Sequence, residues 1–319
     1  MTNDEILALV SDIARQRAGD PQLHGFFKTL LEQSLIGLGS NSMVWRDDGT
    51  CRHRMQVNSL LHFSSNIWSQ RGDDGIIRRI FQLLGVEKGF FIEFGAWDGI
   101  YLSNCRALAQ RCWSGCFIEG DPAKARILRQ NYLGMSDIYC LNQTVLATPG
   151  PHGKTIDEIA CASFPNQKTD FMNIDVDGLD YRVFEEMHLR PTVVCVEGGF
   201  CWHPRFTQRV PEEVAARNMQ QPVAVMIEIA RKKSYTPICF NQNMYFVVDE
   251  QAGPFAGIQK DAVSLWRDAW FNESQAFRDS LRRNRMGAEI RSREGPEFAS
   301  LEFDNPAKIP SPPSPTSGS

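Results

Sequence analysis

The sequence predicts an α/β protein with a mostly parallel sheet that ends in an antiparallel hairpin, and with helical extensions at the N- and C-terminal ends. Two observations support this prediction. Short apolar runs alternate with helical stretches from residue 89 to about residue 250, as expected for parallel strands joined by helical crossovers. Near the end of that region, two strand-like runs are separated only by Asn241-Gln242-Asn243, which is too short for a crossover, so these runs should pair antiparallel.

The first part of the chain, residues 1–66, is expected to be a helical extension. Apolar residues recur at helical spacing on both sides of a break at Asp20-Pro21, which predicts two amphipathic helices before residue 39. Residues 39–68 lack this period and are expected to form a loop. A further helix is predicted from Asp73 to Leu84, with Gly85 as its C-terminal stop.

Residues 67–250 are expected to form the main domain. The predicted elements are strands at 89–94, 115–119, 138–141, 171–176 and 192–197, helices at 102–112, 122–133 and 180–188, and hairpin strands at 238–240 and 244–248. Residues 251–300 are expected to be a helical segment, in which a helix over 259–285 places Val263, Trp266, Trp270 and Phe277 on its apolar side. The tail 301–319 is rich in Pro and Ser and is expected to be disordered.

Composition and charge exclude several classes of function. The net charge of −4 provides no positive field for nucleic acid or anionic lipid, so neither is an expected partner. No apolar run approaches the roughly 18 residues of a membrane span, and the N-terminus lacks the pattern of a signal peptide. The nine cysteines are an odd number and fall mostly in apolar segments, which favours buried thiols in a cytoplasmic protein.

A glycine-containing turn follows the first predicted parallel strand, in the segment Glu93-Phe94-Gly95-Ala96-Trp97-Asp98-Gly99. Ligands of open α/β sheets bind outside the carboxyl ends of the strands, where glycine lets the backbone approach a ligand closely. A side chain at Gly95 is therefore expected to block the ligand by steric overlap and to leave the distant core intact. Glu119 ends the next strand, where a carboxylate can accept both ribose hydroxyls of a nucleoside. Together the two features predict a nucleoside site.

Further acids follow the later strands. Asp175 and Asp177 come at the end of the strand 171–176, and would lie on one side and share a cation or a proton if the strand persists. Alternatively, Asp177 and Asp180 cap the next helix and only Asp175 faces the pocket. Glu197 ends the following strand in the equivalent place, and His203 comes shortly after it. The proton-accepting candidates are therefore Asp175, Asp177, Glu197 and His203.

Residues 67–250 resemble the FkbM-like group of class I S-adenosylmethionine-dependent methyltransferases. FIEFGAWDG resembles the first cofactor motif of that superfamily, and FIEGDP with Leu128 and Asn131 resembles the E-P-x-P and L-x-x-N pattern, with Gly120 where proline is usual. The remaining matches are TIDEIA, NIDVDGLDYRVFEEM, RPTVVCVEGG and the lead-in SQRGDDGIIRRIF. The resemblance covers a little over half of the chain and leaves residues 1–60 and 255–319 unassigned.

The resemblance implies a Rossmann-like class I methyltransferase sheet and S-adenosyl-L-methionine as cofactor. It implies that Glu93, Gly95, Asp98 and Gly99 hold the methionine end of the cofactor, that Glu119 holds the ribose, and that Asn142 lies near the adenine. It also implies methyl transfer to an oxygen of a glycan or of a hydroxylated small metabolite. A general base is needed when the acceptor is a hydroxyl, and an aspartate-bound divalent metal is the alternative way to lower the hydroxyl's pKa.

Two other functions stay open on the sequence alone. Asp175 and Asp177 resemble the D-x-D motif with which a nucleotide-sugar glycosyltransferase holds a metal and a diphosphate, although the glycine-containing turn and the terminal hairpin disfavour this function. A non-catalytic binding module of the same fold is the third hypothesis. The sequence specifies neither the acceptor nor the metal requirement nor the oligomeric state.

Overall fold

The computed structural model describes residues 56, 58–176, 178–199, 207–212, 215, 220–269 and 272. The two helices expected before residue 39, the tail 301–319, and the candidate site residues Asp177 and His203 lie outside the described residues. Within the region expected to be a loop, Leu60–Phe63 form a short 3-10 helix, η2. The division of the chain into four segments stays a prediction.

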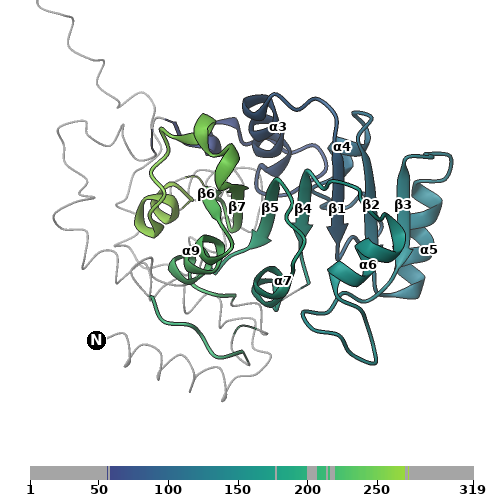
Figure 1. Ribbon diagram of the computed structural model, residues 1–319. Coiled ribbons are helices and arrows are strands. Elements are labelled where there is room, and N and C mark those ends of the chain that lie inside the picture. Colours follow the sequence, from purple (N-terminus) through teal and green to yellow (C-terminus); the bar gives the residue numbers. More distant parts are fainter. Residues whose placement is uncertain are drawn as a thin grey trace, which may run out of the picture.

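The core of the protein is a seven-stranded sheet with the strand order β3-β2-β1-β4-β5-β7-β6 (Figure 1). The strands are β1 Phe90–Phe94, β2 Ser114–Glu119, β3 Ile138–Asn142, β4 Phe171–Ile174, β5 Val193–Glu197, β6 Tyr235–Phe240 and β7 Asn243–Val248. The first five strands pair parallel, and β7 pairs antiparallel with both β5 and β6. The predicted fold class, including the terminal hairpin, is confirmed.

Helices cover both faces of this sheet (Figure 1). The helices are α3 Asp73–Leu84, α4 Arg106–Ala109, α5 Pro122–Asn131, α6 Ile156–Ser163, α7 Asp180–Glu186 and α9 Val223–Lys232. On one face Phe81 of α3 packs edge-on against Phe171 of β4, and on the other Phe184 of α7 stacks on Phe246 of β7. The chain leaves β1 toward β2 and later returns to place β4 on the opposite side of β1. In open α/β sheets such a switch point is where ligands bind.

Helix boundaries agree with the sequence prediction at some positions and differ at others. Helix α3 begins and ends as predicted, with Gly85 in the left-handed conformation at its C-terminus. Helix α4 is far shorter than the predicted 102–112, because Leu102 and Cys112 have φ values of 59° and 61°, which a right-handed helix does not accommodate. The sequence prediction missed α6 and α9, although Thr155 and Glu158 form a capping box at the start of α6.

The predicted apolar side of the C-terminal helix is only partly correct. Residues 262–269 are helical, and Trp266 is buried as expected, but Val263 is exposed. Trp270 and Phe277 lie outside the described residues.

Among the described cysteines, Cys105, Cys116, Cys195 and Cys239 are buried, Cys140 is half-buried, and Cys112 and Cys161 are exposed. The expectation of buried thiols therefore holds for most of them and not for the last two. No helix among the described residues is long and apolar enough to cross a bilayer.

One polar row crosses the otherwise apolar core. Glu93, Asn173, Cys195 and Tyr245 lie opposite one another on the adjacent strands β1, β4, β5 and β7. At one end of the row, the Tyr245 hydroxyl donates a hydrogen bond to Asp73, the first residue of α3. Burial raises the pKa of Asp73 to about 6. The row thus connects helix α3 to strand β1, which the glycine-containing turn follows.

Candidate functional site

The glycine-containing turn after β1 lies against the end of β4. Gly95 has a φ of +72°, and a Cβ atom there would lie 1.8 Å from the carbonyl oxygen of Asp175. A side chain at Gly95 would thus collide with the backbone that follows β4. The space beside Gly95 is therefore filled by the protein itself, and the expectation that such a side chain would leave the distant core intact stays a prediction.

Gly99 and Asp98 shape the remainder of this turn. Gly99 also has a φ of +72°, and its carbonyl oxygen accepts a hydrogen bond of 2.5 Å from the hydroxyl of Tyr132. One carboxylate oxygen of Asp98 accepts the backbone N–H groups of Ile100 and Tyr101, both at 2.8 Å. Asp98 therefore holds the loop backbone in place.

Glu119 ends β2 beside this turn and is 8% exposed. Its Oε2 accepts the backbone N–H of Trp97 at 2.8 Å, and its Oε1 accepts the backbone N–H of Asp121 at 2.8 Å. A carboxylate has about four lone-pair positions, so each oxygen can accept a second hydrogen bond. The amide of Asn142, at the end of β3, donates to the carbonyl oxygens of Glu119 and Gly120 at 2.8 and 3.0 Å. These contacts fix the ends of β2 and β3 to each other.

Glu93 lies inside the protein, with a side chain that is 3% exposed. Ser103 Oγ donates to it at 2.6 Å, the backbone N–H of Asn104 at 2.9 Å and Asn173 Nδ2 at 3.1 Å. Burial raises the pKa of Glu93 to about 7 although these hydrogen bonds oppose the rise. Any effect of Glu93 on the methionine end of a cofactor would therefore be indirect, through Ser103 and Asn104, which Glu93 holds in place.

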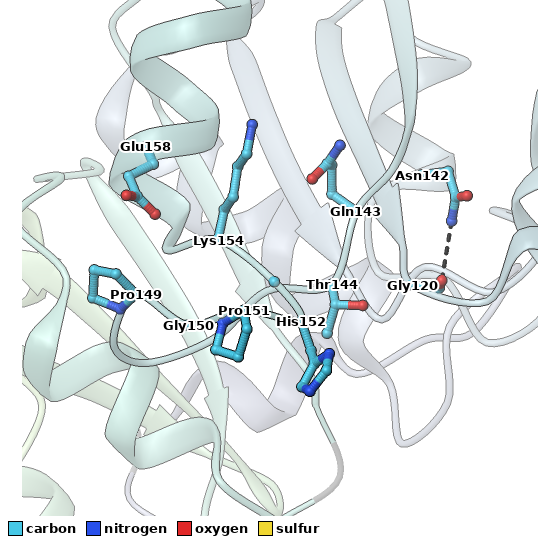
Figure 2. Close-up of a pocket in the computed structure, with 11 residues that line it drawn as sticks. Gly120, Asn142, Gln143, Thr144, Pro149, Gly150, Pro151, His152, Lys154 and Glu158 are labelled. Carbon is cyan, nitrogen blue, oxygen red and sulfur yellow. Dashed lines mark hydrogen bonds between the residues drawn. The ribbon is translucent and has the colours of Figure 1, made fainter.

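An open pocket with a volume of about 570 Å³ lies beyond the ends of β2 and β3. Figure 2 shows Gly120 and Asn142 on one side of this pocket and Glu158 on the other, with the loop 149–154 between them. Thr144 and His152 lie in its middle part. The pocket is lined by Gly120, the residue after Glu119, and its volume falls in the range of about 300–1,000 Å³ that is typical of small-molecule sites.

The acids after β4 and β5 lie in different surroundings. Strand β4 ends at Ile174, so the strand alternation that would place Asp175 and Asp177 on one side does not extend to them. Asp175 is exposed, whereas Glu197 is half-buried at the end of β5. Asp180 is fully buried and accepts the backbone N–H groups of Val176 and Gly178 at 2.7 and 2.9 Å. Burial raises its pKa. Asp180 thus holds the turn before α7. The expectation that it caps this helix is wrong, because Asp180 is the first helical residue, Leu179 occupies the N-cap position, and no side chain caps the helix there.

Sequence reasoning missed Gln220, which joins two of these acids. Its Nε2 donates to Asp180 Oδ2 at 2.6 Å and to Glu197 Oε2 at 2.8 Å. Nothing in the local sequence indicates this contact, because a buried glutamine has no pattern of its own. Within the part of the chain that the structure describes, no three His, Cys, Asp or Glu side chains are grouped so that they could hold a metal ion.

Methyltransferases are among the solved structures that are similar to this chain. No protein-family model matches the sequence, and no curated protein matches it. A SAM-dependent methyltransferase from Aquifex aeolicus is 11% identical with a TM-score of 0.34, and the match covers 64% of this chain and 100% of that one. The O-methyltransferase from Bacillus cereus, solved with SAH, is 10% identical with a TM-score of 0.34, and the match covers 77% of this chain and 100% of that one.

A further similar structure is that of the glycopeptide N-methyltransferase MtfA, solved with sinefungin. It is 11% identical with a TM-score of 0.32, and the match covers 58% of this chain and 88% of that one. Identities and TM-scores this low do not carry an activity from those proteins to this chain. The resemblance to the FkbM-like group stays a prediction.

Proposed function

We propose that this protein is an S-adenosylmethionine-dependent methyltransferase that methylates an oxygen of a glycan or of a hydroxylated small metabolite. The observation that carries the proposal is the position of Glu119, which ends β2 next to the switch point between β1 and β4 and adjoins the open pocket at Gly120. A carboxylate in this place is suited to the two hydroxyls of a ribose. The sheet order and the terminal hairpin agree with the architecture that the resemblance implies.

The residues present fit such a cofactor. Each oxygen of Glu119 accepts one backbone N–H and keeps the capacity for a ribose hydroxyl. The pocket beside Gly120 and Asn142 would take the adenine, and the turn containing Gly95 and Gly99 would face the methionine end. Glu93 and Asp98 would hold the shape of this turn through their hydrogen bonds to its backbone and to the residues that follow it.

When bound, S-adenosylmethionine supplies a methyl carbon whose bond to sulfur breaks as an electron pair of the acceptor atom bonds to it. The protein's contribution is then mainly to hold the acceptor in line and to exclude competing water. A hydroxyl acceptor must also release its proton, and the described candidates for taking it up are Asp175 and Glu197. A divalent metal near Asp175 is the alternative means of activating the hydroxyl, and no described contact favours it over a carboxylate.

Ligand-induced stabilisation tests the proposal directly. SAH at a concentration 100 times its Kd should stabilise the folded protein by about 2.7 kcal/mol, which raises the Tm by several degrees. UDP-glucose with manganese serves as the comparison for the glycosyltransferase alternative. A Tm that rises with UDP-glucose and manganese and is unchanged by SAH would contradict the proposal. Release of SAH from S-adenosylmethionine in the presence of hydroxylated acceptors would then distinguish an enzyme from a non-catalytic binding module.

A further inference from the structure

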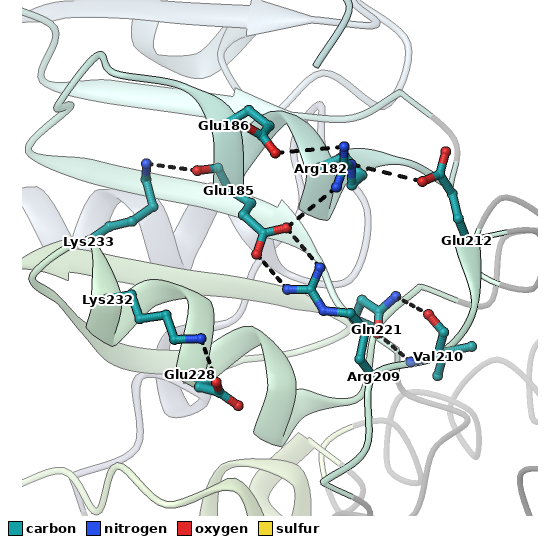
Figure 3. A network of polar contacts seen from close by, with 10 residues as sticks. All are labelled: Arg182, Glu185, Glu186, Arg209, Val210, Glu212, Gln221, Glu228, Lys232 and Lys233. Carbon is teal, nitrogen blue, oxygen red and sulfur yellow. Dashed lines mark hydrogen bonds and ion pairs between the residues drawn. The ribbon is translucent and has the colours of Figure 1, made fainter. Parts of the chain in front are cut away.

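Two buried glutamines stand side by side just before α9 and make different contacts. Gln221 binds the backbone of Val210: its Oε1 accepts the N–H of Val210 at 2.8 Å, and its Nε2 donates to the Val210 carbonyl at 2.9 Å. Figure 3 shows Gln221 and Val210 together with Arg209, which forms a bidentate ion pair with Glu185 of α7. Gln221 and Arg209 thus fasten the segment 207–212 to the body of the protein.

Gln220, in contrast, binds two carboxylates. Its amide group has two N–H bonds, and Nε2 donates to both Asp180 and Glu197. In the opposite orientation the amide oxygen, which can only accept hydrogen bonds, would face two carboxylates. The two acids therefore determine that Nε2 is the end that faces them. The amide therefore separates two acidic side chains that would otherwise repel each other.

The backbone around Gln220 is strained and firmly held. Gln220 has a φ of 48°, in the left-handed region that costs a non-glycine residue about 1–2 kcal/mol, and its side chain is 1% exposed. The next residue, Gln221, accepts the backbone N–H of Gly199 on its carbonyl oxygen at 2.9 Å. Gly199, which follows β5, also forms a parallel β-bridge with Pro222. The surroundings thus keep Gln220 next to the end of β5, where Glu197 lies.

The two acids differ in their burial. Asp180 is fully buried at the start of α7, with both oxygens bonded to backbone N–H groups or to Gln220. Glu197 is half-buried, ends β5, and lies opposite Asn243 of β7. Asp175, the neighbouring acid after β4, is exposed. Gln220 therefore connects an acid fixed in the interior to an acid that reaches the carboxyl edge of the sheet, where the proposed acceptor would bind.

We infer that Gln220 is a positioning residue that holds the Glu197 carboxylate, ionised and in a fixed orientation, to accept the proton of a hydroxyl acceptor. This inference rests on the proposed function and adds to it the base and the residue that positions the base. As the acceptor O–H bond breaks, its electron pair stays on the acceptor oxygen and its proton passes to a Glu197 oxygen. A hydrogen bond donated to a carboxylate favours its charged form, and a fixed base needs no reorganisation during the transfer.

The test compares Gln220→Leu with Gln221→Leu, a matched substitution at the adjacent position. The Glu197 carboxyl is titrated by ¹³C NMR in glutamate-labelled protein, and its signal is assigned with Glu197→Gln. Loss of the amide donor should raise the pKa of Glu197 by about one unit or more in Gln220→Leu, since one hydrogen bond to a charged group is worth about 1.5–3 kcal/mol. Gln221→Leu should leave this pKa unchanged. An equal shift in both variants, or none in Gln220→Leu, would overturn the inference.

Gln220→Gly provides a second variant in case Gln220→Leu does not fold. Glycine relieves the left-handed strain and removes the same two hydrogen bonds, so it should show the same rise in the pKa of Glu197. In both variants the Kd for SAH, measured by calorimetry, should stay within about threefold of the wild-type value, because the bridge lies away from Glu119. Failure of wild-type protein to bind SAH would refute the proposed function, while the titration would still report on the bridge. A normal SAH affinity with an unchanged pKa would refute the bridge alone.

Discussion

The backbone N–H of Trp97 donates a 2.8 Å hydrogen bond to the carboxylate of Glu119, and so ties the loop after β1 to the end of β2. Trp97 has a φ of 50°, and its indole ring is about half exposed, with the ammonium group of Lys124 4.3 Å from the ring centroid. The strained turn is thus stabilised by the same carboxylate that we propose for the ribose. Glu119 orders the loop before a cofactor arrives, which lowers the cost of binding.

Replacement of Glu119 should weaken cofactor binding. Glu119→Ala removes a charged acceptor of two hydroxyls and also the partner of the Trp97 N–H, so the Kd for S-adenosylmethionine should rise about tenfold to a hundredfold. Glu119→Gln keeps the shape and one acceptor oxygen, and should give an intermediate Kd. Calorimetry measures both values. Asp121→Asn is the control, since Asn caps helix α5 as Asp does and should change the Kd by less than about threefold. An unchanged Kd in folded Glu119→Ala would refute the ribose assignment.

A side chain at Gly95 should destabilise the fold more than one at Gly85. Both glycines are left-handed, with φ values of +72° and +68°, but a Cβ atom at Gly85 meets nothing within 4 Å. Gly85→Ala should therefore cost only the conformational strain, about 1 kcal/mol. Gly95→Ala adds the collision with the backbone of Asp175, and should cost about 3 kcal/mol or more. Urea unfolding of the two variants gives the comparison. Equal losses would show that the loop after β4 can move away from Gly95.

Stability should depend on pH through Glu93. Its pKa is about 7 in the folded protein, against an ordinary value of 4.5, so the folded state binds the proton more tightly than the unfolded state. The stabilisation from this group is complete below about pH 4.5, and it is lost as the pH rises through about 7. Glu93→Gln is neutral at every pH, and its amide can replace the carboxylate toward Ser103, whose hydroxyl can also accept.

The variant and the wild type should accordingly diverge with pH. From pH 4 to pH 8, the free energy of unfolding of Glu93→Gln should increase relative to that of the wild type by up to about 3 kcal/mol, because one pKa unit corresponds to about 1.4 kcal/mol. All other titrating groups are common to both proteins and cancel in the difference. Denaturant unfolding at the two pH values provides the measurement. A difference independent of pH would mean that Glu93 is ionised normally within the core.

Turnover should depend on Glu197 more than on Asp175. With a hydroxyl acceptor, Glu197→Gln should lower kcat by about two to four powers of ten while the Kd for the cofactor changes little, since the lost interaction belongs to the transition state. Asp175→Asn should lower kcat by less than about tenfold, because the Asp175 side chain is exposed, whereas Glu197 is half-buried and accepts a hydrogen bond from Gln220. EDTA should have no effect on a carboxylate base. The reverse order of the two variants, with EDTA inhibition restored by magnesium, would move the chemistry to a metal at Asp175.

Local sequence patterns were sufficient for much of the fold. Apolar runs predicted the strands, three intervening residues predicted the hairpin of β6 and β7, and Gly85 predicted the end of α3. These features depend on neighbours within a few positions, which the sequence displays directly. Thr155 and Glu158 could have revealed α6 by the same reasoning, because a capping box is a local signal.

Only the tertiary structure decided what each acid does. Glu93 lies within the apolar strand β1, Asp175 follows β4 and Glu197 ends β5, and their side chains are buried, exposed and half-buried respectively. The difference arises from partners distant in sequence: Asn173 is 80 positions from Glu93, and Gln220 is 23 positions from Glu197. The sequence alone predicted correctly that Glu119 and Glu197 end strands of a mostly parallel sheet. Their burial, protonation and hydrogen bonding depend on which strands become neighbours, since desolvation and hydrogen bonding are set by atoms in space and not by positions along the chain.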